Sequence, residues 1–259
     1  MGKRTAIVTG STSGIGKGVA EGLAAAGCNI VLNGFGDAKQ IETQRAELEK
    51  AHDVGVIYSA ADLTDVAAIE GLFEENAKAF GGVDIVVNNA GVQHVSPVED
   101  FPVAKWDLII ALNLSAAFHT TRLAFPQMKK NGWGRVINIA SAHALVASPF
   151  KSAYVAAKHG ILGLTKTTAL EGAQHGIRVN AICPGYVHTP LVDGQIDDTA
   201  KAREISREDV INNVLLAAQP TKEFVKVEDI AGLVTFLISD AANQVNGAAL
   251  SIDGGWVAQ

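Results

Sequence analysis

The chain has 259 residues, of which 48% are hydrophobic and 19% charged, and its formal net charge is −6. This composition is typical of a folded globular protein and excludes a disordered chain, and the negative charge without a basic run argues against a nucleic-acid partner. Neither Cys28 nor Cys183 lies in a C-x-x-C pair, so we expect no disulfide framework and no metal site. The first residues lack a signal-peptide pattern, and no run reaches the roughly 18 apolar residues that span a bilayer, so we expect a cytoplasmic protein.

Short apolar runs alternate with longer helical patterns along the chain. The alternation predicts an α/β fold with one Rossmann-type doubly wound parallel sheet, and we expect residues 1–259 to form a single domain. Seven runs are predicted strands: residues 5–8, 29–32, 55–58, 83–87, 135–140, 177–182 and 248–252.

A glycine-rich turn follows the first predicted strand and opens a helix that Gly27 ends. Glycines let the backbone turn sharply and approach a pyrophosphate, and the helix N-terminus offers free N–H groups and a partial positive charge. The turn therefore predicts a dinucleotide site, the alternative being a purely structural glycine turn. Its candidate cofactor-binding residues are Gly10, Thr12, Ser13, Gly14, Ile15 and Gly16.

The turn after the second predicted strand discriminates between NAD and NADP. It reads Asn33-Gly34-Phe35-Gly36-Asp37, and neither this turn nor Ser13 carries a cation. A 2′-phosphate buried without a cation would be costly, so we expect NAD, with Phe35 against the adenosine ribose. Lys17 and Lys39 are the nearest residues that could overturn this expectation.

Two segments carry groups suited to moving a proton. Ser141 ends a predicted buried strand, at the edge where ligands of open α/β sheets bind. Tyr154 and Lys158 lie four residues apart on one face of a predicted helix, 152–175. A phenol has an unperturbed pKa of about 10, and we expect the ammonium to lower it.

The segment 189–219 departs from this regular alternation. It is polar and follows the sixth predicted strand, so it would overhang the carboxyl edge of the sheet. We expect a helical substrate lid there, the alternative being a solvated surface helix pair.

Taken together, these motifs resemble the short-chain dehydrogenase/reductase family over essentially the whole chain. The matching pieces are the TGSTSGIG turn, Asn88-Asn89-Ala90-Gly91, Asn113, Ser141, the Tyr154/Lys158 pair and Pro184-Gly185. The resemblance implies that Tyr154 is the general acid/base and that Ser141 orients the substrate oxygen. It also implies that Lys158 lowers the pKa of Tyr154 and holds the nicotinamide ribose, while Asn113 anchors a water in the proton relay.

The resemblance also supplies further cofactor contacts, in their order along the chain. Asp62 and Leu63 correspond to an adenine-contacting pair, and Asn89 and Gly91 to positions that line the adenosine ribose. The nicotinamide carboxamide is expected near Pro184, Gly185, Val187 and Thr189.

Four polar residues are expected around the reacting carbon: Gln93, His143, Lys151 and Gln195. A cation among hydrogen-bonding groups suits a small carboxylate, because a buried anion needs charge and donors. The pattern resembles members of the family that act on short 3-hydroxy acids, although Lys151 alone could be a solvated lysine. In such a site Tyr186 and Trp256 would pack against the methyl end of the substrate.

The expected activity is thus the NAD-dependent interconversion of (R)-3-hydroxybutyrate and acetoacetate, in a homotetramer as the family implies. A 3-oxoacyl thioester reductase or another small secondary-alcohol dehydrogenase of the same family is the alternative within enzymes. A non-catalytic dinucleotide sensor is the alternative outside enzymes. Such proteins commonly lack a residue of the tetrad Asn113, Ser141, Tyr154 and Lys158, which is complete here.

Overall fold

The computed structural model describes residues 3–258. Within that range it describes the backbone but not the side chains of seven residues that follow the sixth strand: Pro190, Leu191, Gln195, Asp198, Thr199, Ala202 and Arg203.

Over these residues one seven-stranded sheet organises the chain, and every neighbouring pair of strands in it is parallel. Its order is β3-β2-β1-β4-β5-β6-β7. The seven predicted strands are confirmed, and their bounds are β1 Thr5–Val8, β2 Asn29–Asn33, β3 Val56–Ser59, β4 Ile85–Asn88, β5 Gly134–Ile139, β6 Ile177–Pro184 and β7 Ala249–Ile252.

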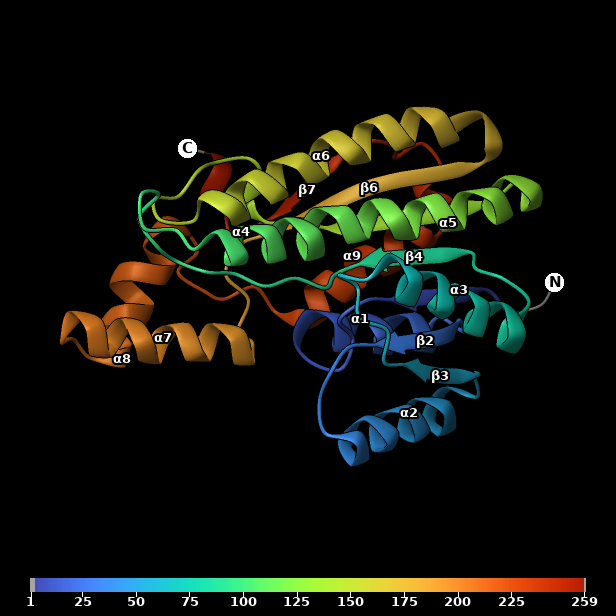
Figure 1. Cartoon of the computed structure of the whole chain (residues 1–259), viewed down its shortest axis with the longest axis horizontal. Coiled ribbons are helices and arrows are strands. Elements are labelled where there is room, and N and C mark those ends of the chain that lie inside the picture. The colour runs from blue at the N-terminus through green and yellow to red at the C-terminus, as the bar shows by residue number, and fades with distance from the viewer. Residues whose placement is uncertain (1–2, 259) are drawn as a thin grey trace.

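Helices cover both faces of the sheet (Figure 1). One face carries α1 (Gly14–Ala25), α2 (Ala38–His52) and α9 (Val227–Ile238). The other carries α3 (Val66–Phe80), α4 (Val103–Ile110), α5 (Ala116–Asn131) and α6 (Ser152–Gly172). The predicted helix 152–175 is α6 followed by a short 3₁₀ turn, Ala173–His175.

The alternation of side chains along the strands explains these two layers. On β1, Ala6 and Val8 belong to the core shared with α1 and α9, whereas Ile7 belongs to the core on the opposite face. All three are fully buried, as expected for a parallel strand covered on both sides.

The strand order reverses direction between β1 and β4. Ligands of doubly wound sheets bind outside the carboxyl ends of the strands at such a switch point. The glycine turn after β1 and the Asn-Asn-Ala-Gly segment after β4 flank this point. The fold therefore brings together the predicted motifs.

The segment after β6 forms α7 (Pro190–Arg203) and α8 (Arg207–Asp209), continued by a π-helical segment, Val210–Leu215. It projects beyond the carboxyl edge of the sheet (Figure 1). Buried Val192, Ile196, Val210 and Leu215 form their own apolar cluster, packed against Tyr186 and Phe224. The segment is therefore helical as predicted, and it has a core rather than the character of a solvated helix pair.

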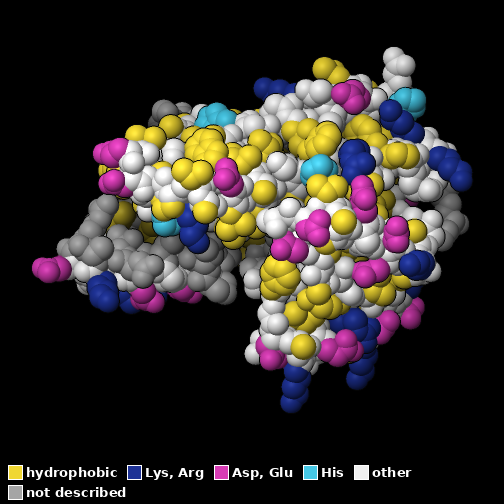
Figure 2. All heavy atoms as spheres, in the orientation of Figure 1, with side chains coloured by type: hydrophobic (Ala, Val, Ile, Leu, Met, Phe, Trp, Pro, Cys, Tyr) yellow, Lys and Arg dark blue, Asp and Glu magenta, His cyan; other side chains and the backbone are white. Residues whose placement is uncertain are grey.

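The continuous helix 103–131 is long and apolar enough, by length and composition alone, to cross a membrane. Its most apolar window is 44% buried, and α5 packs against β4, β5 and α3. Hydrophobic side chains are visible over α4, α5 and α6 in Figure 2. The packing identifies it as a helix that covers the sheet.

Candidate active site

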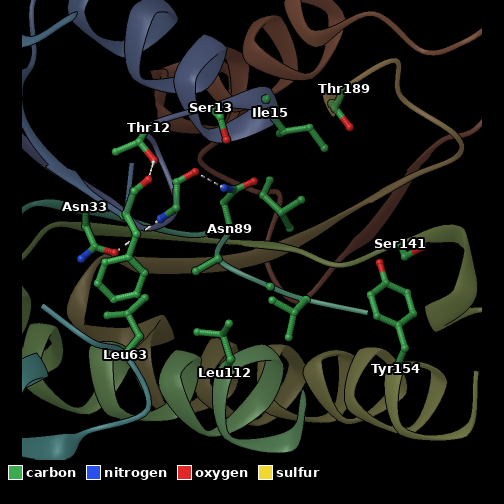
Figure 3. A pocket seen from close by; sticks show the side chains of 18 of the residues that line it. Thr12, Ser13, Ile15, Asn33, Leu63, Asn89, Leu112, Ser141, Tyr154 and Thr189 are labelled. Atoms are coloured by element: carbon green, nitrogen blue, oxygen red, sulfur yellow. Dashed lines mark hydrogen bonds between the residues drawn. The ribbon is translucent and has the colours of Figure 1, made fainter. Parts of the chain in front are cut away.

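A cavity of about 590 Å³ lies along the carboxyl edge of the sheet (Figure 3). Residues from the loops after β1 to β6, together with α4 and α6, line it. Among the predicted site residues, those that line it are Gly10, Thr12, Ser13, Gly14, Ile15, Phe35, Asp62, Leu63, Asn89, Gly91, Ser141, Tyr154, Lys158, Pro184, Gly185 and Thr189.

The glycine turn has the geometry that a dinucleotide requires. Gly10 and Gly14 adopt φ values of +62° and +52°, which favour glycine. Ser13 precedes α1 as its N-cap but makes no side-chain capping hydrogen bond. The first N–H groups of α1 therefore remain available to an anion such as a pyrophosphate.

Gly16 and Val187, also predicted to bind the cofactor, do not line the cavity. A β-carbon on Gly16 would clash with the Gly10 carbonyl oxygen and the Asn89 amide, so Gly16 lets α1 pack closely against the turn. Val187 is buried and pairs with Val225.

The end of the cavity near β2 and β3 is built around Asn33. This buried side chain accepts a hydrogen bond from the Gly10 N–H at 3.5 Å and donates to the Ala61 carbonyl at 3.0 Å. The Phe35 side chain is 68% exposed, and the Phe35 backbone carbonyl accepts a hydrogen bond from the Thr12 hydroxyl at 2.9 Å. The backbone N–H and hydroxyl of Thr64 donate to Asp62 and lower the pKa of its carboxyl.

The charges along the cavity bear on the form of the dinucleotide. Among its described lining residues, Asp62 and Lys158 are the charged side chains. Neither Lys17 nor Lys39 lines it. Asp37 caps α2 by accepting from the Gln40 N–H at 2.9 Å.

Asn113 lies in a π-helical segment, Ala111–Ser115, that interrupts the helix between α4 and α5. Its side chain accepts from the Val92 N–H and donates to the Val92 carbonyl, both at 2.9 Å. Both polar atoms are thus occupied by backbone. A second cavity of about 10 Å³, the size of one water, lies between Asn113 and Lys158. The water-anchoring role of Asn113 stays a prediction, and this cavity is the space that such a water would occupy.

Tyr154 and Ser141 present their hydroxyl groups to the same part of the main cavity (Figure 3). Burial raises the pKa of Tyr154, a hydrogen bond with Ser141 opposes the rise, and nearby Tyr186 adds to it. The prediction of a lowered pKa is wrong for this structure. The physical reason is that desolvation of the phenolate outweighs the hydrogen bond that favours it.

Lys158 is buried, and its Nζ lies 5.6 Å from the centroid of the Tyr154 ring. The ammonium donates to the Ile139 carbonyl at 2.7 Å, which fixes its position at the end of β5. Burial lowers the pKa of Lys158 to about 8. Near neutral pH this group therefore exchanges its proton more readily than an exposed lysine does.

Four of the predicted substrate residues cluster beside Tyr154. The His143 ring lies edge-on to Tyr154, with centroids 6.2 Å apart, and edge-on to Trp256 at 5.0 Å. Tyr186 stacks on Trp256 at 5.4 Å, and the Lys151 Nζ lies 5.8 Å from the Tyr186 ring centroid. These residues come from the loop after β5, the N-terminus of α6, the end of β6 and the segment after β7.

Lys151 is only 9% exposed, so it is not the solvated lysine of the alternative interpretation. Within the described part of the chain it makes no ion pair with a carboxylate. Burial lowers the pKa of Lys151, and burial together with the Lys151 charge lowers that of His143 to about 4. The cluster thus combines a buried cation that no described carboxylate pairs with and an imidazole that is neutral at pH 7.

The two glutamines predicted to bind the substrate differ in whether their side chains are described. Gln93 is half-buried in the loop after β4 and does not line the cavity. Gln195 lies in α7, and its side chain is outside the described residues. Its predicted contact with substrate therefore stays a prediction.

Sequence reasoning missed several residues that line the cavity. Asn33 had a usable signal, because a polar residue that ends an apolar strand beside the switch point faces the ligand edge. Leu108 and Leu112 were accessible through their spacing of four residues on one helix. The other missed lining residues are Gly34, Ala61, Thr64, Ala90, Val92, Ile139 and Ala140.

Comparison with known proteins places the chain among dehydrogenases and reductases. Residues 10–257 match a family model described as enoyl-(acyl carrier protein) reductase. A "D-beta-hydroxybutyrate dehydrogenase" from Rhizobium meliloti is 59% identical over 256 residues, covering 99% of both chains. An enzyme of the same description from Cupriavidus necator is 54% identical over 256 residues, covering 99% of this chain and 98% of its own.

Solved structures agree with this relationship. A candidate short-chain alcohol dehydrogenase from Sinorhizobium meliloti superposes with a TM-score of 0.90 at 36% identity, covering 100% of this chain and 98% of its own. A candidate gluconate dehydrogenase from Agrobacterium tumefaciens gives 0.88 at 35% identity, covering 100% and 97%.

Proposed function

Because the chain belongs to the short-chain dehydrogenase/reductase family and is an oxidoreductase, we propose that it interconverts (R)-3-hydroxybutyrate and acetoacetate with NAD. Two relatives that are more than 50% identical to this chain support the choice, because both are named D-beta-hydroxybutyrate dehydrogenase. The observation that carries it is Lys151, a buried ammonium with no carboxylate partner among the described residues. Its Nζ lies 5.8 Å from the Tyr186 ring centroid, in the same cluster as His143, whose ring lies edge-on to that of Tyr154.

A carboxylate is the substrate group that this surrounding suits best. A buried charge is stable only when it is paired and hydrogen-bonded, and no described carboxylate pairs with Lys151. The substrate anion would complete the pair. His143, neutral at pH 7, adds a hydrogen-bonding imidazole without a second positive charge. Gln93 and Gln195 are proposed as further partners of the carboxylate.

The cavity fits a dinucleotide. The uncapped N-terminus of α1 would receive the pyrophosphate, Asp62 and Leu63 the adenine, and Pro184, Gly185 and Thr189 the carboxamide. When bound, NAD supplies the hydride acceptor and a positive charge that favours the phenolate form of Tyr154. Lys158 would hold the ribose of the nicotinamide half.

The chain's own residues would perform the proton chemistry. The Ser141 hydroxyl would donate a hydrogen bond to the substrate oxygen and orient it. In the oxidation direction the Tyr154 oxygen accepts the hydroxyl proton as the C3–H electron pair leaves as hydride. Lys158 stabilises the phenolate through its charge, and the water-sized cavity beside Asn113 would lead the proton away.

The preference for NAD rests on the charges along the cavity. A 2′-phosphate would meet no described cation at the adenosine end, where Phe35 and Asp62 lie. We therefore expect kcat/KM to favour NAD over NADP by at least a factor of about 10, equivalent to about 1.4 kcal/mol. Steady-state kinetics with both cofactors measure this ratio. Equal efficiencies would contradict the proposal and direct attention to Lys17 and Lys39.

A turnover assay tests the function directly. NADH formation should be rapid with (R)-3-hydroxybutyrate, and slow with the (S) enantiomer and with the methyl ester. The matched control is the Tyr154→Phe variant, which keeps the shape of the ring. No turnover of the (R) acid with either cofactor would refute the proposal.

A second candidate is a 3-oxoacyl thioester reductase, which the acyl-carrier description of the matching family model favours. That reaction uses NADPH and a long uncharged acyl chain. The buried Lys151 and the lack of a described cation at the adenosine end weigh against it. Reduction of a 3-oxoacyl thioester with NADPH, without turnover of the free acid, would establish it.

We also propose that the chain is one domain, acts in the cytoplasm and assembles as a homotetramer. A groove of about 430 Å³ between α5 and α6, lined by Phe118, Phe125 and Pro126, supports the assembly. Phe118 is 48% exposed on α5, and Leu170 is 79% exposed on α6. Light scattering should give the mass of a tetramer, and Phe118→Glu should lower it.

A further inference from the structure

Tyr186 and Trp256 form what we call the aromatic wall. Their rings stack at 16° with centroids 5.4 Å apart, facing His143 and Lys151. The two residues come from different segments, Tyr186 from the end of β6 and Trp256 from the turn after β7. Neither lies within a strand, so the sheet ladder does not fix them.

Gln219 fixes the first half of the wall from behind. Its side chain is fully buried, and its Oε1 accepts a hydrogen bond from the Tyr186 N–H. Its Nε2 donates to the Glu223 carbonyl at 2.6 Å. The Tyr186 carbonyl in turn accepts from the Val225 N–H at 2.9 Å. Both backbone polar groups of Tyr186 are therefore held by the segment 219–225.

Asp253 fixes the second half. It is 5% exposed, and its two carboxylate oxygens accept from the Gly255 and Val257 N–H groups at 3.1 and 3.0 Å. The two donors are the residues before and after Trp256, so these bonds close the turn that positions its indole. A buried carboxylate that accepts only backbone N–H groups is a strong structural anchor.

The two anchors are joined to each other. The Thr221 N–H donates to the Gly254 carbonyl at 3.2 Å, and the Gly185 N–H donates to the Ile252 carbonyl at 3.1 Å. A β-carbon at Gly185 would clash with the Gln219 side chain, and one at Gly254 with Thr221. The three segments therefore pack closely, and the wall has little room to move.

We infer that Gln219 and Asp253 are positioning residues that hold the aromatic wall and thereby limit the chain length of the hydroxy acid. The inference rests on the proposed function. A rigid wall near the reacting carbon excludes longer acyl chains, and a displaced wall admits them. One methylene group in an apolar pocket changes kcat/KM by about 10- to 200-fold, so selectivity reports the wall's position sensitively.

The test compares kcat/KM for (R)-3-hydroxybutyrate and (R)-3-hydroxyhexanoate in Gln219→Ala and Asp253→Asn. We expect the ratio of kcat/KM for (R)-3-hydroxybutyrate to kcat/KM for (R)-3-hydroxyhexanoate to fall by a factor of about 10 or more in each variant. The KM for 3-hydroxybutyrate should rise more than kcat falls, because the loss is in substrate positioning. The KM for NAD should hardly change, since neither residue lines the cofactor cavity.

Asn180→Ala is the matched control. Asn180 is a buried amide of β6 that accepts from the Ala248 N–H and donates to the Val245 carbonyl, at 3.0 and 2.8 Å. Its loss removes a similar pair of bonds away from the wall, so stability should fall while the selectivity ratio stays. If Gln219→Ala does not fold, Gln219→Glu is the second variant. It keeps the acceptor for the Tyr186 N–H but places an oxygen against the Glu223 carbonyl, which repels it. The selectivity ratio should therefore fall in this variant too.

Two failures are distinguishable. If wild type turns over 3-hydroxybutyrate but the ratio in both anchor variants matches that of Asn180→Ala, the positioning role is refuted. If wild type does not turn over the acid at all, the proposed function itself has failed.

Discussion

The two edges of the sheet bury cations in opposite ways. At the amino edge the guanidinium carbons of Arg4 and Arg135 lie over Trp133, at 3.6 and 4.4 Å from the indole centroid, and the Arg178 charge acts on Arg135. At the carboxyl edge Lys158 is buried beside Tyr154, and Lys151 is buried beside Tyr186. We propose that the first group stabilises the fold, whereas the second provides the chemistry of the site.

The difference lies in the partners. Arg135 donates to the Gly134 and Gly176 carbonyls at 2.8 and 3.1 Å and to the Asn243 side chain at 2.6 Å. Arg4 donates to the carbonyl of Ile238 at the C-terminus of α9, and Arg178 donates to the carbonyl of Ala173, the C-cap of α6; helix dipoles are negative at both places. Lys151 has no comparable partner among the described residues. The guanidinium of Arg135 is held by these three bonds from its two terminal nitrogens, although its buried Nε has no hydrogen-bond partner among the described residues. We propose that Arg135 is structural, and that Lys151, for which the described residues supply no hydrogen-bond or ion-pair partner, binds a ligand.

The comparison predicts its largest effect at Tyr154. Tyr154→Phe removes the transferable proton but keeps the ring, so kcat should fall by about 10²- to 10⁴-fold. Binding of NADH, followed by fluorescence, and the midpoint of urea unfolding should stay close to wild type. A variant that kept a tenth of the activity would mean that another group is the base.

At the amino edge of the sheet, replacing a polar side chain by an apolar one should change the stability of the protein but not its activity. Arg135→Met leaves three acceptors without their donor, at about 1–3 kcal/mol for each buried one, so the free energy of unfolding should fall by about 3 kcal/mol. Activity per folded molecule should stay. Arg178→Met, at a half-buried position, is the control with a smaller loss. A specific loss of kcat with unchanged stability would break the contrast between the edges.

A smaller effect should follow from pH. The folded-state pKa of His143 is lowered to about 4, so below pH 6.5 the unfolded state binds a proton that the folded state does not. Its contribution to stability is complete above pH 6.5 and should shrink by about 2 kcal/mol at pH 5. Arg135, with a pKa of about 10, stays charged throughout. Urea unfolding of wild type and His143→Gln at both pH values measures the difference, and equal acid sensitivity would contradict it.

Most of this arrangement could be predicted from the sequence, because its signals are local. Strand periodicity, the glycine turn and the Tyr154/Lys158 spacing each depend on a few neighbouring residues. The prediction that Lys151, His143, Tyr186 and Trp256 meet came from the resemblance to the family, and the structure does bring them together.

What could not be predicted depends on contacts between distant segments. Gln219 looks like any polar residue at the end of a lid, and only its burial against Tyr186 reveals its role. The π-helical segment that carries Asn113 has no local sequence signal. The direction of the Tyr154 pKa was missed because desolvation follows from packing, which the spacing of Tyr154 and Lys158 does not show.

The central claim is that Lys151 binds the carboxylate of the substrate. The selectivity of Lys151→Met between acid and ester tests it most directly. Wild type should strongly prefer (R)-3-hydroxybutyrate over its methyl ester. The variant should lose most of that preference, with about 2–5 kcal/mol lost in kcat/KM for the acid alone. Stability at pH 7 should stay or rise, since a charge that burial disfavours is removed. An unchanged acid-to-ester ratio would contradict the account and leave an unspecified small secondary alcohol as the substrate.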